Sequence, residues 1–303
     1  MEIDLGAIWG WVGMNYDVLP EEAVTRLELA GAVSDPPADG AIDMAETALA
    51  LAMCRQGATD LAWYRTHLQT LADDVATYFA AEVEPYGVDP AVKALSTVIS
   101  ELHGYHGDQL TYEDRQNADF IRVIDRRKGL PVSLGIIYMH VARAQGWSIC
   151  GLNFPGHFLV RLDIEGERAI LDPFVGGAVL SPMDLKEKYA ATIGERANFG
   201  LSVYRPVSDR DVLLRLQNNL KLRYLRDDRP DRALNVLETM LKIAPDRPFL
   251  LREAALMKAE LHMTREAIAA LERYLHMIDA VPGQEVERRQ MWSMLRELKT
   301  RPV

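Results

Sequence analysis

Long hydrophobic runs, cysteine and positive charge are all scarce in this sequence. No apolar run approaches the roughly eighteen residues of a membrane-spanning helix, and the opening MEIDLGAIWG starts acidic where a secretory signal would start basic. We therefore expect neither a membrane partner nor a signal peptide. Two cysteines among 303 residues form neither a disulfide framework nor a metal-binding pattern, so the sequence predicts a protein of the reducing cytoplasm.

Basic residues are outnumbered, 34 Lys and Arg against 44 Asp and Glu, which gives a net charge of −10. This balance argues against nucleic acid as the main partner, because phosphate binding needs a basic surface. The local basic run RVIDRRKG (122–129) is typical of a helix end, where cations complement the helix dipole. No phosphate-binding loop or dinucleotide fingerprint is present, and we expect no cofactor. A hydrophobic fraction of 49% with 26% charged residues indicates a globular protein.

Helical periodicity begins near Asp43. The stretch GAVSDPPADG (31–40) is rich in turn formers, so residues 1–40 are interpreted as an N-terminal extension, with Trp9 and Trp11 as an expected anchoring contact. It stays open whether this extension belongs to the core. Apolar residues at steps of three and four predict helices over 44–56, 60–80 and 91–104, and another over 117–129 that Gly129 closes.

The period changes after residue 147. PVSLGIIYMHVARAQG (131–146) predicts an apolar, buried helix closed by Gly146, and short β-branched or aromatic runs follow it. LVRLDI and ERAILD, separated by Glu165 and Gly166, predict a hairpin with a tight turn. The sequence therefore predicts an α+β domain over 41–205, with several helices and a small antiparallel sheet.

The last third of the chain is helical and repeats itself. Residues 231–246 align with 265–280 at an offset of 34, so that Ala233 matches Ala267 and Leu237 matches Leu271. This period belongs to the tetratricopeptide repeat, whose surfaces bind protein partners. We expect an all-α repeat tail over 209–303. Two repeat units are few for a free-standing array, so the tail is expected to pack against the middle domain.

Three residues could form a catalytic set. Ser133 lies in the first turn of the apolar helix, His157 near the start of a strand, and Asp172 at the end of the next strand. An aspartate that accepts from an imidazole leaves the other ring nitrogen free as a base for a serine hydroxyl. Each residue also has a structural interpretation: Ser133 as the helix N-cap, His157 as a strand histidine and Asp172 as a turn residue.

Other candidate sites are weaker. His103, His106 and Asp108 could hold a metal, but their spacing around a glycine is more typical of a helix end and loop, so we expect no metal site. His140 is interpreted as a core histidine. PVSLG lacks the first glycine of a nucleophile elbow, which disfavours an α/β-hydrolase.

The phrases NADFIRVIDRRKGLPVSLGIIYMHVARAQGW, GLNFPGHFLVRL and ILDPFVGG resemble the transglutaminase-like domain of the bacterial SirB type, which typically carries a tetratricopeptide tail. The resemblance covers roughly residues 40–280 and implies a papain-like core. In active members of the superfamily a cysteine opens the buried helix, followed by His and Asp on strands. His157 and Asp172 match the last two positions, and Ser133 is the nearest equivalent of the cysteine.

Two hypotheses follow. The first is a non-catalytic module that has lost the thiol and recruits a protein or peptide through the repeat tail. The second is a hydrolase or acyltransferase on amide or ester bonds that uses Ser133 as nucleophile, His157 as base and Asp172 as orienter. A serine hydroxyl is a far weaker acid than a thiol, so the sequence favours the first hypothesis.

Overall fold

The computed structural model describes residues 19–34, 41–57, 59–82, 86–194 and 199–300. Trp9 and Trp11 lie outside them. The elements before the sheet, in chain order, are α2 (Glu21–Ala32), α3 (Met44–Gln56), α4 (Ala62–Ala80), α5 (Val88–Ser96), a π-helical turn (Thr97–Leu102), β1 (His106–Gly107), a 3₁₀ turn (Arg115–Ala118), α6 (Phe120–Arg126) and β2 (Lys128–Gly129).

The chain continues through the sheet into a helical tail. These elements are α7 (Pro131–Ala144), β3 (Ser148–Leu152), β4 (Leu159–Ile164), β5 (Glu167–Asp172), a 3₁₀ turn (Pro173–Val175), β6 (Ala178–Val179), α8 (Pro182–Ile193), a 3₁₀ turn (Leu201–Tyr204), β7 (Pro206–Val207), α9 (Asp209–Arg226), α10 (Pro230–Ile243), α11 (Pro248–Glu260), α12 (Thr264–Ile278) and α13 (Glu285–Thr300).

The main sheet has five antiparallel strands in the order β6-β5-β4-β3-β7. The predicted hairpin is confirmed: β4 and β5 pair from Val160 opposite Leu171 to Ile164 opposite Glu167. Glu165 and Gly166 between them both have positive φ, at 51° and 87°, as a two-residue turn that follows the strand twist requires. At the open end of this hairpin, the beginning of β4 lies beside the end of β5. The candidate site belongs to this end of the sheet.

Helix α7 is the centre of the molecule. Ten of its residues are buried, and it contacts the sheet on one side and α3, α4 and α9 on others. Its last turn ends at Gln145, and Gly146 takes a left-handed φ of 76° after it, as predicted. The apolar sequence of this helix is thus explained by neighbours on every side.

The helix before β2 ends earlier than the sequence predicted. α6 stops at Arg126, and Arg127, rather than Gly129, adopts the left-handed conformation (φ 57°). Gly129 instead pairs with Gly107 in a two-residue parallel ladder. A Cβ at Gly129 would lie 2.5 Å from the Ser133 hydroxyl oxygen. The glycine is therefore needed for close approach, and the expectation that it caps the helix was wrong.

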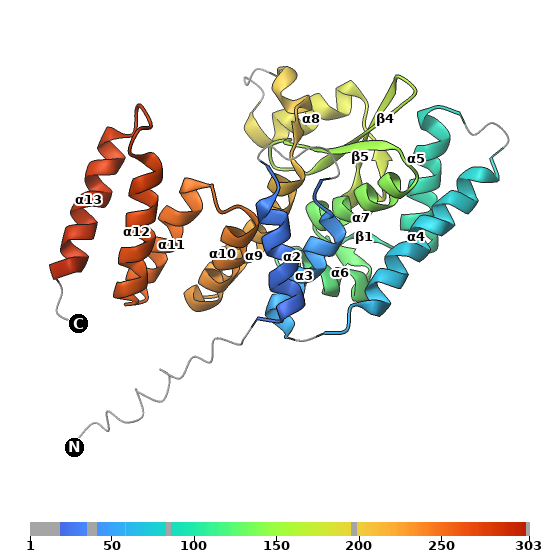
Figure 1. The fold of residues 1–303 in the computed structure, drawn as a ribbon. Coiled ribbons are helices and arrows are strands. Elements are labelled where there is room, and N and C mark those ends of the chain that lie inside the picture. The colour runs from blue at the N-terminus through green and yellow to red at the C-terminus, as the bar shows by residue number, and fades with distance from the viewer. Residues whose placement is uncertain (1–18, 35–40, 58, 83–85, 195–198, 301–303) are drawn as a thin grey trace.

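Part of the N-terminal extension is core. Residues 21–32 form α2, which packs against α3 and α10 and buries Ala23, Leu27 and Ala30. Figure 1 shows α2 and α3 side by side next to α9 and α10. Arg210 on α9 is buried and donates to the carbonyl oxygens of Ala30 and Val33 at the end of α2 and of Ile243 at the end of α10. One guanidinium thus satisfies carbonyls at two helix ends.

The tail consists of antiparallel helices, as predicted for tetratricopeptide repeats. α11 packs on α12 and α12 on α13, around buried residues such as Leu251, Leu271 and Leu295. In Figure 1 these three helices extend away from the sheet, with α9 and α10 between them and the middle domain. Val212, Leu216 and other buried residues of α9 belong to the same hydrophobic core as α7. The first repeat helix is thus shared by the tail and the middle domain.

Candidate functional site

Ser133 is the third residue of α7, not the residue that caps it. Leu130 is the N-cap, Pro131 occupies the first position, and no side chain caps the first turn. Proline is favoured at this position because it has no N–H to satisfy. The interpretation of Ser133 as the N-cap is therefore wrong, because a cap side chain accepts from a backbone amide, and the Ser133 hydroxyl is a donor.

The Ser133 side chain is 0% exposed, and its hydroxyl points at backbone carbonyls. Oγ lies 2.9 Å from the carbonyl oxygens of both Leu130 and Asn117, and the Leu130 N–H also donates to Asn117 O at 3.1 Å. The start of α7 is thus tied to the loop that precedes α6. Within the described part of the chain, no hydrogen bond joins Ser133 to His157.

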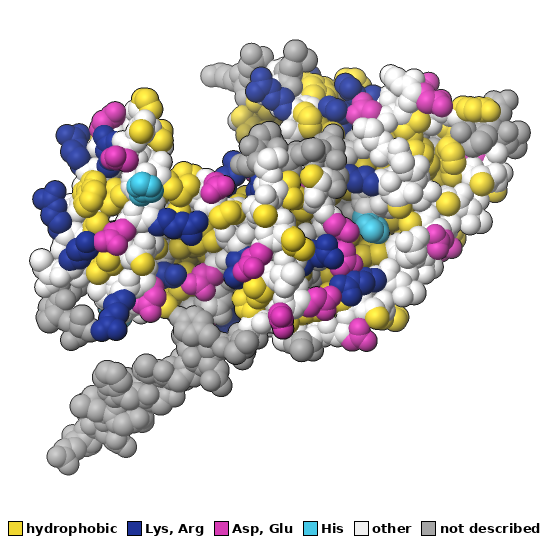
Figure 2. Space-filling model, in the orientation of Figure 1, with side chains coloured by type: hydrophobic (Ala, Val, Ile, Leu, Met, Phe, Trp, Pro, Cys, Tyr) yellow, Lys and Arg dark blue, Asp and Glu magenta, His cyan; other side chains and the backbone are white. Residues whose placement is uncertain are grey.

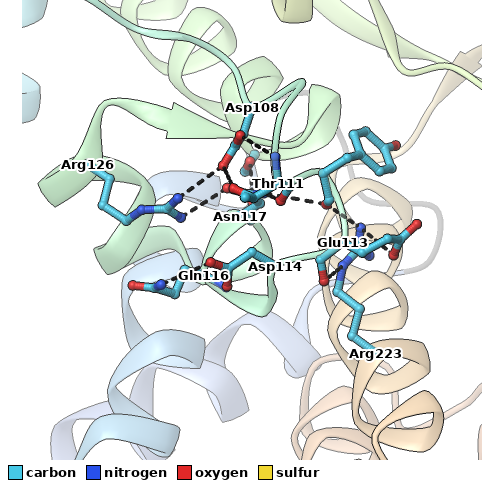
Figure 3. A network of polar contacts seen from close by, with 10 residues as sticks. Asp108, Thr111, Glu113, Asp114, Gln116, Asn117, Arg126 and Arg223 are labelled. Atoms are coloured by element: carbon cyan, nitrogen blue, oxygen red, sulfur yellow. Dashed lines mark hydrogen bonds and ion pairs between the residues drawn. The ribbon is translucent and has the colours of Figure 1, made fainter.

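Asn117 belongs to a polar network that we call the bracket, defined as Asp108, Thr111, Asn117, Arg126 and Ser133. The Asn117 amide donates to Thr111 O at 2.7 Å and accepts from Arg126 at 3.0 Å, and Arg126 donates to Asp108 at 3.0 Å (Figure 3). The Asp108 carboxylate also accepts from the Thr111 amide and hydroxyl. Burial alone would raise the pKa of Asp108, but these hydrogen bonds hold it at about 2.

The repeat tail reaches the same loop through α9. The Arg223 guanidinium is buried and donates to Tyr112 O at 2.9 Å and Glu113 O at 3.2 Å (Figure 3). Arg226, one turn further along α9, pairs with the Glu113 carboxylate. The bracket therefore connects the start of α7 to the first helix of the repeats through one short loop.

Asp172, the last residue of β5, pairs with a lysine, whereas the sequence predicted His157 as its partner. Its carboxylate is 3% exposed, accepts from the Phe174 amide at 3.1 Å and pairs with Lys188 of α8 at 3.1 Å. The hydroxyl of Tyr138 on α7 is fully buried and has no hydrogen-bond partner among the residues that the structure describes. Burial, with a further contribution from the Asp172 charge, raises the pKa of Tyr138. Asp172 is thus satisfied by a cation and a backbone amide.

His157 lies two residues before β4 and is half-buried. Its carbonyl accepts from Arg215 of α9 at 2.7 Å, and its ring makes an edge contact with Phe154. Burial lowers the pKa of His157, and Lys188 lowers it further, whereas Asp172 opposes them by raising it. His157 precedes the first residue of β4 and Asp172 is the last residue of β5, so both belong to the open end of the hairpin. No hydrogen bond between their side chains is present in the described part of the chain.

These contacts define what the arrangement can do chemically. Burial lowers the pKa of His157, which favours the neutral ring that a base needs, but its expected orienter is engaged by Lys188, and the expected nucleophile is buried and engaged by two carbonyls. Cys54 does not replace it: burial chiefly raises the pKa of its thiol, which lies on α3. Cys150 lies on β3 and packs against the apolar cluster that contains Leu152 and Phe154.

Each of the three candidate metal ligands interacts with a different partner. His103 pairs with Asp74, the His106 ring bonds Gly104 O, and Asp108 belongs to the bracket. A search of the described residues found no group of three or more His, Cys, Asp or Glu side chains placed to hold a metal.

Sequence reasoning missed Lys188, Arg215, Asn117 and Arg223. Lys188 lies on α8, seven residues after Ser181, whose capping box begins that helix. The capping box predicts the helix, but it does not predict the contact of Lys188 with Asp172. Arg215 and Arg223 lie on α9, whose charged residues are typical of an exposed repeat helix. Only the packing of α9 against the middle domain turns these arginines inward.

Comparisons with known proteins agree with this architecture. Residues 62–218 match the model of the transglutaminase-like superfamily, and residues 220–297 match a tetratricopeptide repeat model. The chain belongs to the transglutaminase-like superfamily, with a tail of tetratricopeptide repeats, which are generally protein-interaction modules.

The relatives carry the name UPF0162 protein. One from Xylella fastidiosa (strain Temecula1) is 32% identical over 259 residues, covering 82% of this chain and 91% of the relative. Another, from Vibrio cholerae, is 27% identical over 252 residues, covering 83% and 92%. No solved structure matches the chain significantly.

The surface has mixed charge on the face drawn in Figure 2, where basic and acidic side chains are interspersed over the described residues. None of the described helices combines the length and the apolar character that a membrane crossing requires.

Proposed function

We propose that this protein is a non-catalytic transglutaminase-like module that recruits a protein partner through its repeat tail. The observation that carries the proposal is the state of Ser133: its hydroxyl is fully buried, and its single proton is shared between two backbone carbonyl oxygens. A nucleophile must be accessible to solvent and to a base. Ser133 could meet these two requirements only if the start of α7 separated from Asn117 and the loop before α6. The ion pair of Asp172 with Lys188 adds support, since it occupies the carboxylate that would orient His157.

The narrower assignment to the SirB type rests on the motifs GLPVSLG, PGHFLVR and LDPFVGG. A cytoplasmic location is supported by the scarcity of cysteine. Both belong to the proposal.

The distribution of exposed apolar side chains supports the tail as the recruiting surface. Between residues 209 and 300, the large apolar side chains that are exposed within described helices are Leu222, Leu225, Phe249, Val286 and Trp292. All five belong to α9, α11 and α13, and none belongs to α10 or α12. Alternate helices of stacked repeats share one face of the array, and exposed aromatic residues are typical anchors of protein interfaces.

The proposal predicts that a charge on this face abolishes partner capture. Phe249→Asp and Trp292→Asp should each reduce the protein recovered with the tagged full-length chain by about tenfold or more, because an aromatic anchor contributes at least about 2 kcal/mol. The measurement is quantitative mass spectrometry of crosslinked pull-downs. Ala269→Asp, an exposed position on α12, is the matched control and should retain the wild-type partners.

Point variants are preferable to removal of residues 209–303, because α9 shares the core of the middle domain. If Phe249→Asp and Trp292→Asp recover the same partners as the wild type, the repeat face is not the recruiting surface.

A further inference from the structure

A cavity of about 410 Å³ lies beside the bracket, and Asp108 belongs to both. Its walls come from three separate parts of the fold: Ser100 within the π-helical turn, residues 106–110 with Lys128 on the β1–β2 ladder, and residues 174–176 after Asp172. The volume lies at the small end of the range for ligand pockets, about 300–1,000 Å³.

The cavity has a lysine in its wall, in a protein whose net charge is −10. Lys128 and His106 line it, and within the described residues Lys128 has no ion-pair partner. The acid in the lining, Asp108, is neutralised by Arg126 within the bracket. His106 Nδ1 donates to the Gly104 carbonyl oxygen, which fixes the ring at the rim of the cavity.

A backbone donor lies on the same strand. The amides of His106 and Asp108 donate to Arg127 and Gly129 of the neighbouring segment. Because successive amides of a strand point in opposite directions, the Gly107 amide lies on the edge of β1 that β2 leaves free. Gly107 also lines the cavity.

The remaining wall is apolar. The Phe174 ring lies against Gly107, where a Cβ would come within 2.4 Å of it. Leu110 is 93% exposed and Val175 is 53% exposed, and both line the cavity. An exposed leucine and valine beside a lysine and a free backbone amide fit a ligand that presents an anion and an apolar group together.

We infer that this cavity binds the C-terminal residue of a partner polypeptide, with an apolar side chain at that position. One such residue carries both features: its α-carboxylate reaches Lys128 and the Gly107 amide, and its side chain packs on Phe174, Leu110 and Val175. Capture of a terminal carboxylate by cations and free backbone amides is a recurrent mode of peptide recognition. The inference goes beyond the proposed function and does not depend on it, since the tail variants leave the cavity unchanged.

Fluorescent peptides that end in Leu, Val or Phe test the inference by anisotropy with the full-length chain. Three forms of each peptide are compared: a free C-terminus, an amidated C-terminus, and an amidated C-terminus with glutamate as the last residue. Peptides with a free terminus should bind at least about tenfold more tightly than either amidated form, because amidation removes the charge that pairs with Lys128.

Lys128→Ala should remove most of this preference, and Lys128→Glu should reverse it. Lys299→Ala on α13, an exposed lysine paired with Glu272, is the matched control and should bind as the wild type does. Equal binding of the free and amidated forms would overturn the inference, as would the absence of binding by any peptide of the panel. Equal binding of the glutamate form would assign the cavity to acidic side chains and overturn it too.

Discussion

Replacement of Asp209 by alanine is expected to lower the free energy of unfolding by about 3–5 kcal/mol. Arg143 at the end of α7 donates to both Asp209 oxygens at 2.8 Å, and the Asp209 side chain is only 4% exposed. Removal of one partner leaves the other charge without compensation in a poorly solvated place. Since a domain is stable by only about 5–15 kcal/mol, a loss of this size is a large fraction of the total.

Urea denaturation followed by circular dichroism measures this loss. The matched control is Asp231→Ala, because Asp231 also lies in the first turn of a repeat helix and pairs with an arginine, but Arg229 is 40% exposed. An exposed pair contributes about 1 kcal/mol or less. Equal losses in the two variants would show that the Arg143–Asp209 pair does not hold α9 against the middle domain.

The second large effect is expected at Asp108. Asp108→Ala removes the acceptor of three hydrogen bonds from the Thr111 amide, the Thr111 hydroxyl and Arg126, and leaves Arg126 without its carboxylate. We expect a loss of about 3 kcal/mol, because hydrogen bonds to a charged group contribute about 1.5–3 kcal/mol each and are not additive. Asp114→Ala in the same loop removes one exposed cap, and should cost about 1 kcal/mol.

The same carboxylate predicts a pH dependence. The pKa of Asp108 falls from 3.8 to about 2 on folding, so the unfolded chain binds the proton more readily than the folded chain does. Its stabilisation is therefore complete above about pH 4 and is lost as the pH falls through about 2. Urea midpoints across this window should fall less steeply in Asp108→Asn than in the wild type. An identical acid dependence in the two proteins would contradict the assignment.

The fold was largely predictable because its patterns are local. The alternation in LVRLDI and ERAILD, with Glu165–Gly166 between them, determines the hairpin, and the apolar sequence of 131–146 identifies the central helix. The 34-residue offset identifies the repeat. Each signal depends on neighbours along the chain, which is why sequence alone shows it.

The contacts at the site could not be predicted because they depend on distant residues. Nothing local distinguishes Lys188 from other lysines of α8, yet it occupies the Asp172 carboxylate. The role of α2 in the core was hidden by the turn formers that follow it. Because α7 begins at Pro131, Ser133 lies inside the first turn and not at the cap position. Its hydroxyl therefore donates to the Asn117 carbonyl, whereas a cap side chain would accept from a backbone amide.

The central claim is that the Ser133 hydroxyl has a structural role in the bracket and does not act as a nucleophile. Labelling with a fluorophosphonate probe, followed by peptide mapping, tests it most directly when the wild type is compared with Ser133→Ala and His157→Ala. The account predicts no adduct on Ser133 and the same labelling in all three proteins, because the hydroxyl is buried and engaged by two carbonyls. An adduct on Ser133 in the wild type that both variants abolish would contradict the account and establish a serine enzyme.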